Sequence, residues 1–152
     1  MGNPVSAANI RQAIQTIALD ALGPDFKVHE RQFDVQGNSE KFLDSGVSVL
    51  WGSMAEATSR IDQYLSVSQN FTVVITVKGF VGMADDKSVA KVDSAFTSIN
   101  ELLKRCVKDK LDNNASVNEV RLGGVSAPQP FNVNQRDVVQ ITISLTVFYL
   151  IT

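Results

Sequence analysis

Few residues in this chain could carry nucleophilic or acid–base chemistry. The sequence has one histidine, His29, and one cysteine, Cys106. A nucleophile needs a base beside it, but Cys106 falls on the apolar stripe of a predicted helix, where a buried thiol packs as a small hydrophobe. We interpret His29, which precedes Glu30 and Arg31, as a solvated strand residue. We therefore predict no catalytic residue and do not expect an enzyme.

Metal and phosphate sites have equally little support. One cysteine and one histidine are too few for an ordinary zinc site within one chain. Asp85 and Asp86 are better explained as caps of the helix that follows them. The glycines within residues 79–82 and 123–124 lack the spacing and the lysine of a phosphate-binding loop, and we interpret them as turns. We expect no metal and no cofactor.

The composition is that of an ordinary globular domain. The chain has 152 residues, of which 44% are hydrophobic and 20% charged, and we expect one domain over residues 1–152. The net charge of −2 argues against a protein whose main task is to grip nucleic acid. No stretch approaches the about 20 apolar residues of a membrane helix. The N-terminus lacks the pattern of a secretory signal, so we expect a cytosolic location.

The strongest structural signal is a long C-terminal strand over residues 138–150. Period-two alternation predicts a strand with one face in a core, and the apolar positions on that face are Val139, Ile141, Ile143, Leu145, Val147 and Tyr149. At roughly 3.3 Å per residue the strand is about 40 Å long, well above the typical length. We expect such a strand to overhang its sheet or to pair with another chain. The alternative is that it pairs within its own sheet and frays at its end.

The remaining elements predict a mixed fold. A helix is expected over residues 6–22, capped by Ser6 and ended by Gly23 and Pro24. A second helix is expected over residues 85–110, with an apolar stripe formed by Val89, Val92, Phe96, Ile99, Leu103 and Cys106. Strands are expected over residues 26–35, 46–51, 71–80 and 117–122. In the second of these Val47, Val49 and Trp51 share one face, and in the third Phe71, Val73, Ile75 and Val77 do. Residues 52–70 are interpreted as a long excursion from the sheet, glycines 123–124 as a break, and residues 126–132 as a loop. The predicted fold is α+β, a mainly antiparallel sheet with two helices packed on one face.

This layout can be followed through nearly all of the chain. Its segments are the helix SAANIRQAIQTIAL, a strand pair with a polar loop, the strand FTVVITVKGF, the helix KSVAKVDSAFTSINELLKRCV, the segment VNEVRLGGVSAPQPF and the strand DVVQITISLTVFYL. In this order and proportion the chain resembles the tail terminator (tail completion) proteins of long-tailed bacteriophages. The resemblance is one of layout, because that family has no catalytic motif.

The resemblance implies a structural role in a virion. Members form a hexameric ring on the end of the tail tube, stop its polymerisation and offer a surface to the head–tail connector protein. The implied partners are copies of the chain itself, the tail tube protein and the connector, with DNA passing through the lumen without sequence-specific binding. The implied location is the virion tail or neck, and the host cytoplasm during assembly. A slightly negative net charge suits a lumen that lets DNA pass.

A ring requires two different complementary surfaces on each subunit. We expect the exposed backbone of the last strand to supply one surface, because an unpaired edge can accept a strand from a neighbour. The segments 52–70 and 123–136 are expected to cover the adjoining subunit. The candidate interface side chains are Tyr64, Phe131, Val133, Arg136, Phe148 and Leu150.

Two other classes of function remain open from the sequence. The chain could serve another step of phage morphogenesis, as a tail tube subunit or a head–tail joining protein; a tube subunit would polymerise into long tubes. It could instead be a small-molecule-binding regulatory module, which would show an apolar pocket and a melting temperature that rises with ligand.

Overall fold

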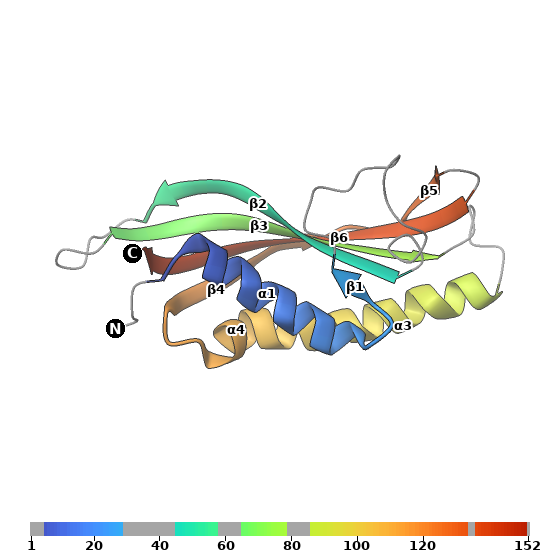
Figure 1. Cartoon of the computed structure of the whole chain (residues 1–152), viewed down its shortest axis with the longest axis horizontal. Coiled ribbons are helices and arrows are strands. Elements are labelled where there is room, and N and C mark those ends of the chain that lie inside the picture. Colours follow the sequence, from blue (N-terminus) through green and yellow to red (C-terminus); the bar gives the residue numbers. More distant parts are fainter. Residues whose placement is uncertain (1–4, 29–44, 58–64, 79–85, 134–135, 152) are drawn as a thin grey trace.

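A computed structural model describes residues 5–28, 45–57, 65–78, 86–133 and 136–151. For residues 78, 86–92, 131–133 and 136–137 within these ranges, only the backbone is described. It has two layers, a six-stranded, mostly antiparallel sheet with α1 and α3 on one face (Figure 1). The predicted α+β class is confirmed. The predictions for His29, Asp85 and the glycines within 79–82 lie outside the described residues.

Helix α1 (Ala7–Leu22) forms where its sequence signals predict it. The Ser6 side chain accepts a hydrogen bond from the Asn9 amide at 3.3 Å, and Gly23 ends the helix with φ 105° and its amide bonded to the Leu19 carbonyl. This φ lies in the left-handed region, where glycine avoids the steric cost of a side chain. The buried face carries Ile10, Ile14, Ile17 and Ala18.

The sheet is ordered β1-β2-β3-β6-β4, with β5 also paired to β6. Its strands are β1 (Lys27–Val28), β2 (Ser45–Glu56), β3 (Leu65–Lys78), β4 (Val117–Val125), β5 (Gln129–Val133) and β6 (Arg136–Ile151). The short β1 is parallel to β2, and the other pairs are antiparallel.

The expectation that the last strand is an exposed edge is wrong. β3, at 14 residues, is nearly as long as the 16-residue β6 and pairs with it from Lys78 opposite Val138 to Leu65 opposite Ile151. β4 and β5 occupy the other side of β6. The alternative prediction, in which the strand pairs within its own sheet, is the one observed.

Parts of three segments predicted to leave the sheet belong to it. Within 52–70, residues 52–56 continue β2 and residues 65–70 begin β3. Gly123 and Gly124 do not end β4, which continues through a bulge between Leu122 and Gly124. Within 126–132, residues from Gln129 onward form β5. None of these segments alternates in hydropathy over enough residues to be recognised as a strand.

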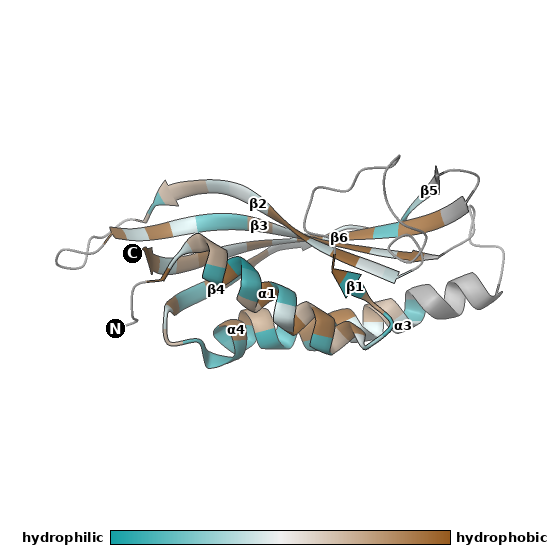
Figure 2. Ribbon diagram, viewed as in Figure 1, coloured by the Kyte–Doolittle hydropathy of each residue, from teal (hydrophilic) through white to brown (hydrophobic). Residues whose placement is uncertain are grey.

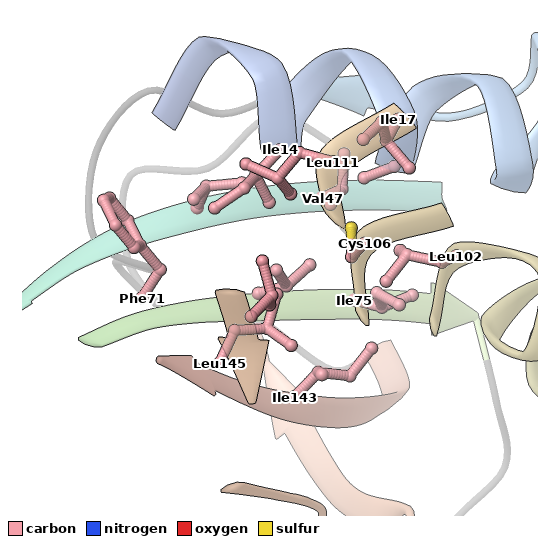
Figure 3. Packing of buried hydrophobic residues seen from close by; sticks show 14 of the residues in the cluster. Ile14, Ile17, Val47, Phe71, Ile75, Leu102, Cys106, Leu111, Ile143 and Leu145 are labelled. Atoms are coloured by element: carbon pink, nitrogen blue, oxygen red, sulfur yellow. The ribbon is translucent and has the colours of Figure 1, made fainter. Parts of the chain in front are cut away.

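The core lies between the sheet and the helices (Figure 3). Bands of apolar and polar residues alternate along β3 (Figure 2), and its inward residues Phe71, Val73, Ile75 and Val77 are buried as predicted. α3 (Asp86–Leu103) was expected to bury Phe96 and Leu103, but these are only partly buried. Its most deeply buried residues are Ala95, Ile99 and Leu102. Its predicted apolar stripe therefore packs against the sheet with a shifted centre.

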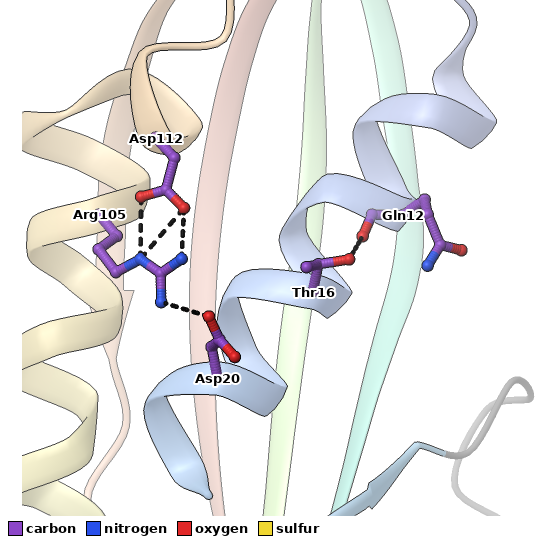
Figure 4. A network of polar contacts seen from close by, with 5 residues as sticks. All are labelled: Gln12, Thr16, Asp20, Arg105 and Asp112. Atoms are coloured by element: carbon purple, nitrogen blue, oxygen red, sulfur yellow. Dashed lines mark hydrogen bonds and ion pairs between the residues drawn. The ribbon is translucent and has the colours of Figure 1, made fainter.

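The second helix does not run regularly to Lys110 as predicted. It passes into a π-helical turn, η1 (Lys104–Lys108), and then into α4 (Lys110–Asn113), whose four residues all have φ between 50° and 59°. This left-handed turn buries Leu111, which is 3% exposed. Arg105 holds the turn by donating from Nε to both Asp112 carboxylate oxygens, at 2.9 and 3.1 Å, and joins it to α1 through Asp20 at 3.3 Å (Figure 4).

Candidate assembly surface

The final six residues of β2 are exposed, unlike the first half of the strand. Residues 46–49 are buried, whereas residues 51–56 are all exposed. We call residues 51–56 the exposed segment of β2. They lie beside β3 at the end of the sheet where α1 begins (Figure 1). In the described part of the chain, no strand pairs with the outer edge of β2 beyond Val47. The segment therefore presents backbone groups and side chains together.

Arg11 of α1 marks the beginning of this exposed segment. Its Nε donates to the Val49 carbonyl at 2.8 Å, and its guanidinium lies over the Trp51 ring, 5.5 Å from the centroid. The other neighbour of that ring is Phe71, with centroids 6.1 Å apart. Trp51 shares the face of Val47 and Val49, as predicted, but is 51% exposed. Cation–π and aromatic contacts of this kind hold the indole in place while part of it faces solvent.

The exposed segment bends at a bulge between Trp51 and Met54. A Cβ at Gly52 would lie 2.4 Å from the Asn70 carbonyl oxygen, so the two backbones approach more closely than any other residue allows. The Asn70 amide donates to Ser53 Oγ at 3.1 Å and accepts from Thr146 Oγ1 at 2.8 Å. These bonds tie the bulge to β3 and β6.

The opposite edge of the sheet is formed by β4, whose outer side is also without a paired strand in the described residues. Leu122 on this strand is 44% exposed. Arg121 bonds Glu119 at 3.0 and 3.3 Å and covers the Phe148 ring, 4.8 Å from its centroid. Two bulges interrupt the strand, and bulges are a common feature of sheet edges.

A hollow of about 290 Å³ lies where the end of α1 and the residues after it meet the start of β2, the end of β3 and α3. Its lining combines apolar side chains with hydroxyls and one carboxylate, from Leu22, Asp25, Phe26, Ser45, Val77, Ser94, Ala95 and Ser98. These groups could hydrogen-bond a small polar ligand. Among the described residues, the lining contains no histidine, cysteine or basic side chain.

The remaining titratable groups of interest are structural in position. Cys106 is fully buried, as predicted, and burial raises the pKa of its thiol to about 12. Tyr149 donates to Gln69 Oε1 at 2.6 Å within the core, and burial raises the pKa of its hydroxyl. Among the described residues, no group of three or more metal-ligating side chains occurs. No helix in the described ranges is long and apolar enough to cross a membrane.

The six predicted interface residues do not form one surface. Tyr64 lies outside the described residues, and only the backbones of Phe131, Val133 and Arg136 are described, at the β5–β6 end. Phe148 lies twelve residues further along β6, about 40 Å away at roughly 3.3 Å per residue, and is partly buried beneath Arg121. Leu150 is fully buried in its own chain, which leaves its side chain no area to offer a partner. A role in an interface stays a prediction for the other five.

Sequence reasoning missed the residues that are most exposed for their type. The exposed large hydrophobic residues among those described are Trp51, Met54, Leu65 and Leu122. Trp51 ends the apolar alternation of Val47 and Val49 and shares their face, and this alternation alone does not distinguish an exposed tryptophan from a buried one.

Comparisons with known proteins show a likeness to solved structures and none to a family model or a curated protein. No family model matches the chain, and no curated protein matches it. Among solved structures, it is similar to a chain of the virion of a native gene transfer agent (GTA) particle, at a TM-score of 0.45 and 13% identity. The alignment covers 93% of this chain and 94% of that one. No argument about function follows from a similarity at this level.

Proposed function

We propose that this chain is a structural virion protein that assembles with copies of itself into a closed ring, and that the ring caps the phage tail tube. The observation that carries the proposal is the exposed segment of β2. Among the described residues no strand pairs with its outer edge, and it adds to that edge Trp51 at 51% and Met54 at 41% exposure. Such edges are ordinarily protected, because they accept strands from other chains.

The layout of the chain supports the finer part of the proposal. The order of elements that resembles the tail terminator proteins, a capped first helix, a long central strand, a second helix and a long last strand, is present in the fold. In that role the ring would stop tube polymerisation and offer a docking surface to the head–tail connector protein. The described residues contain no group of side chains that supports a chemical reaction more strongly than the exposed segment supports assembly.

The test is the mass and shape of the purified protein. We expect light scattering to detect closed oligomers that form as concentration rises, and negative-stain images to show rings. Met54→Lys should weaken assembly, because it places a charge on the exposed segment, whereas Thr97→Lys on the exposed surface of α3 should not. A strict monomer at all concentrations would contradict the proposal, and long tubes would favour a tail tube subunit instead.

A second candidate function is favoured by the hollow beside α1 and α3. Its mixed lining and its volume of about 290 Å³ approach the lower limit of small-molecule pockets, about 300 Å³. If a small molecule binds there, the chain would act as a regulatory binding module. A melting temperature that rises on addition of a small polar ligand, in a protein that stays monomeric, would support this function over assembly.

A further inference from the structure

The two edges of the sheet that no described strand covers, those of β2 and β4, lie at the same level along the strands. The pairing register runs straight across the sheet, and one row consists of Trp51, Phe71, Leu145 and Leu122. The two inner members are 0% and 1% exposed, whereas the two outer members are 51% and 44% exposed. The centre of this row is thus buried, whereas each of its two ends is an exposed apolar side chain.

The next row repeats this arrangement at the β2 edge. Its members are Met54, Gln69, Val147 and Val120. Directly opposed residues of paired strands share a face of the sheet and contact one another. If two copies met edge to edge at the same level, Trp51 of one copy would lie beside Leu122 of the other.

The strand directions permit this contact. β2 is antiparallel to β3, β3 to β6, and β6 to β4, so β2 and β4 run in opposite directions. A β4 strand placed beside β2 therefore continues the antiparallel alternation. In each copy, no described strand pairs with the outer edge of β2 or with that of β4. The contact between β2 and β4 can therefore be repeated head to tail from copy to copy.

We propose that β4 of a second copy adds to the outer edge of the exposed segment of β2, continuing the sheet from one subunit into the next. Leu122 of the partner subunit then covers Trp51. Arg11, already bonded to the Val49 carbonyl at that edge, marks the point where the added strand stops. This inference rests on the proposed function, which requires self-assembly, and it identifies the two surfaces that meet.

The test uses single cysteines on the two edges. Ala55 on β2 and Glu119 on β4 are both exposed. The register places them in one row across the sheet, because Ala55 pairs with Ser68, Ser68 with Phe148, and Phe148 with Glu119. This row lies on the face of the sheet opposite to Trp51. Ala55→Cys and Glu119→Cys are made as separate proteins, mixed and oxidised mildly. The native Cys106 can remain, because it is fully buried. We expect a disulfide-linked dimer in the mixture and none in either protein alone.

Three results would overturn this inference, and they separate it from the proposed function. Cross-linking of Ala55→Cys with itself would indicate a two-fold β2–β2 contact. Oligomers seen by light scattering without cross-linking in the mixture would leave assembly standing and reject these edges. Monomers alone would reject both. A mixture of Glu119→Cys with Thr97→Cys is the control and should give no dimer, because Thr97 lies on α3, away from the edge of β2.

Discussion

Arg105 joins two acidic side chains from different parts of the chain. It contacts Asp20 and Asp112 and so connects α1 to the turn after η1. Hydrogen bonds from Arg105 hold the pKa of the Asp112 carboxyl below its ordinary value, and the same bonds hold the pKa of Arg105 above its own. The Asp112 side chain is 42% exposed, so water screens the pair and its contribution to stability is small.

Asp112→Asn tests this contribution and its pH dependence. We expect a loss of about 0.5 kcal/mol in the free energy of unfolding at pH 7, since asparagine tolerates the left-handed backbone but carries no charge. The folded pKa lies below the unfolded value of about 3.9. The ion pair therefore stabilises the fold above that value, and its contribution is lost as the pH falls through the folded pKa.

Urea unfolding at pH 7 and at acid pH measures this difference. The gap between wild type and Asp112→Asn should close on acidification, because wild-type Asp112 then becomes neutral as well. Asp93→Asn, at an exposed position of α3, should leave the unfolding free energy unchanged at both pH values. A gap of the same size at both pH values would show that the ion pair is not its source.

Among the elements, the left-handed turn α4 is the least favourable on local grounds. Each residue with an L side chain in this conformation costs roughly 1–2 kcal/mol, and all four residues of Lys110–Asn113 adopt it. Two contacts offset part of this cost: Leu111 packs into the core, and Asp112 bonds Arg105. The turn is therefore held by its surroundings and not by its own sequence.

Lys110→Gly should stabilise the protein. Lys110 is exposed and has φ 50°, so glycine removes a steric cost of roughly 1–2 kcal/mol. Glycine also increases the entropy of the unfolded chain, which costs about 0.4–1 kcal/mol, leaving a net gain of about 0.5 kcal/mol. Glu101→Gly, at an exposed position of α3, should instead cost about 1 kcal/mol. Chemical denaturation would reject this account if both variants were destabilised alike.

In the whole molecule, the region that holds the fold and the region proposed for assembly are different. The core lies between the helices and the inner face of the sheet, whereas the exposed segment of β2 contributes little to it. A change in that segment should therefore alter association more than stability. This separation is what a protein that is folded before it assembles requires.

Gly52→Ala tests the separation. Its Cβ would lie 2.4 Å from the Asn70 carbonyl oxygen, so the bulge must shift and the exposed edge must change shape. We expect assembly, measured by light scattering, to weaken, while the melting temperature falls by only a few degrees, equivalent to about 1 kcal/mol. Ser53→Ala removes the hydrogen bond from Asn70 without a backbone clash and should still assemble. Normal assembly of Gly52→Ala would argue against the exposed segment as the interface.

The local elements could be predicted because their patterns record which side of each is buried. The alternation from Val139 to Tyr149 predicts β6, the spacing of Ile10, Ile14 and Ile17 predicts α1, and both signals lie within a few neighbouring residues. The burial of Cys106 follows from its place on such a pattern.

Strand order and exposure depend on contacts between distant segments, and no local pattern contains them. β6 is internal because β3, some 70 residues earlier, matches its length and β4 and β5 pair with its other side, whereas Trp51 stays half exposed although Arg11 and Phe71 lie against its ring. The left-handed turn at Leu111 likewise exists only because the core receives that side chain. Periodicity in the sequence indicates which face of an element is apolar. Whether another element covers that face, and which one, depends on the packing of the whole chain.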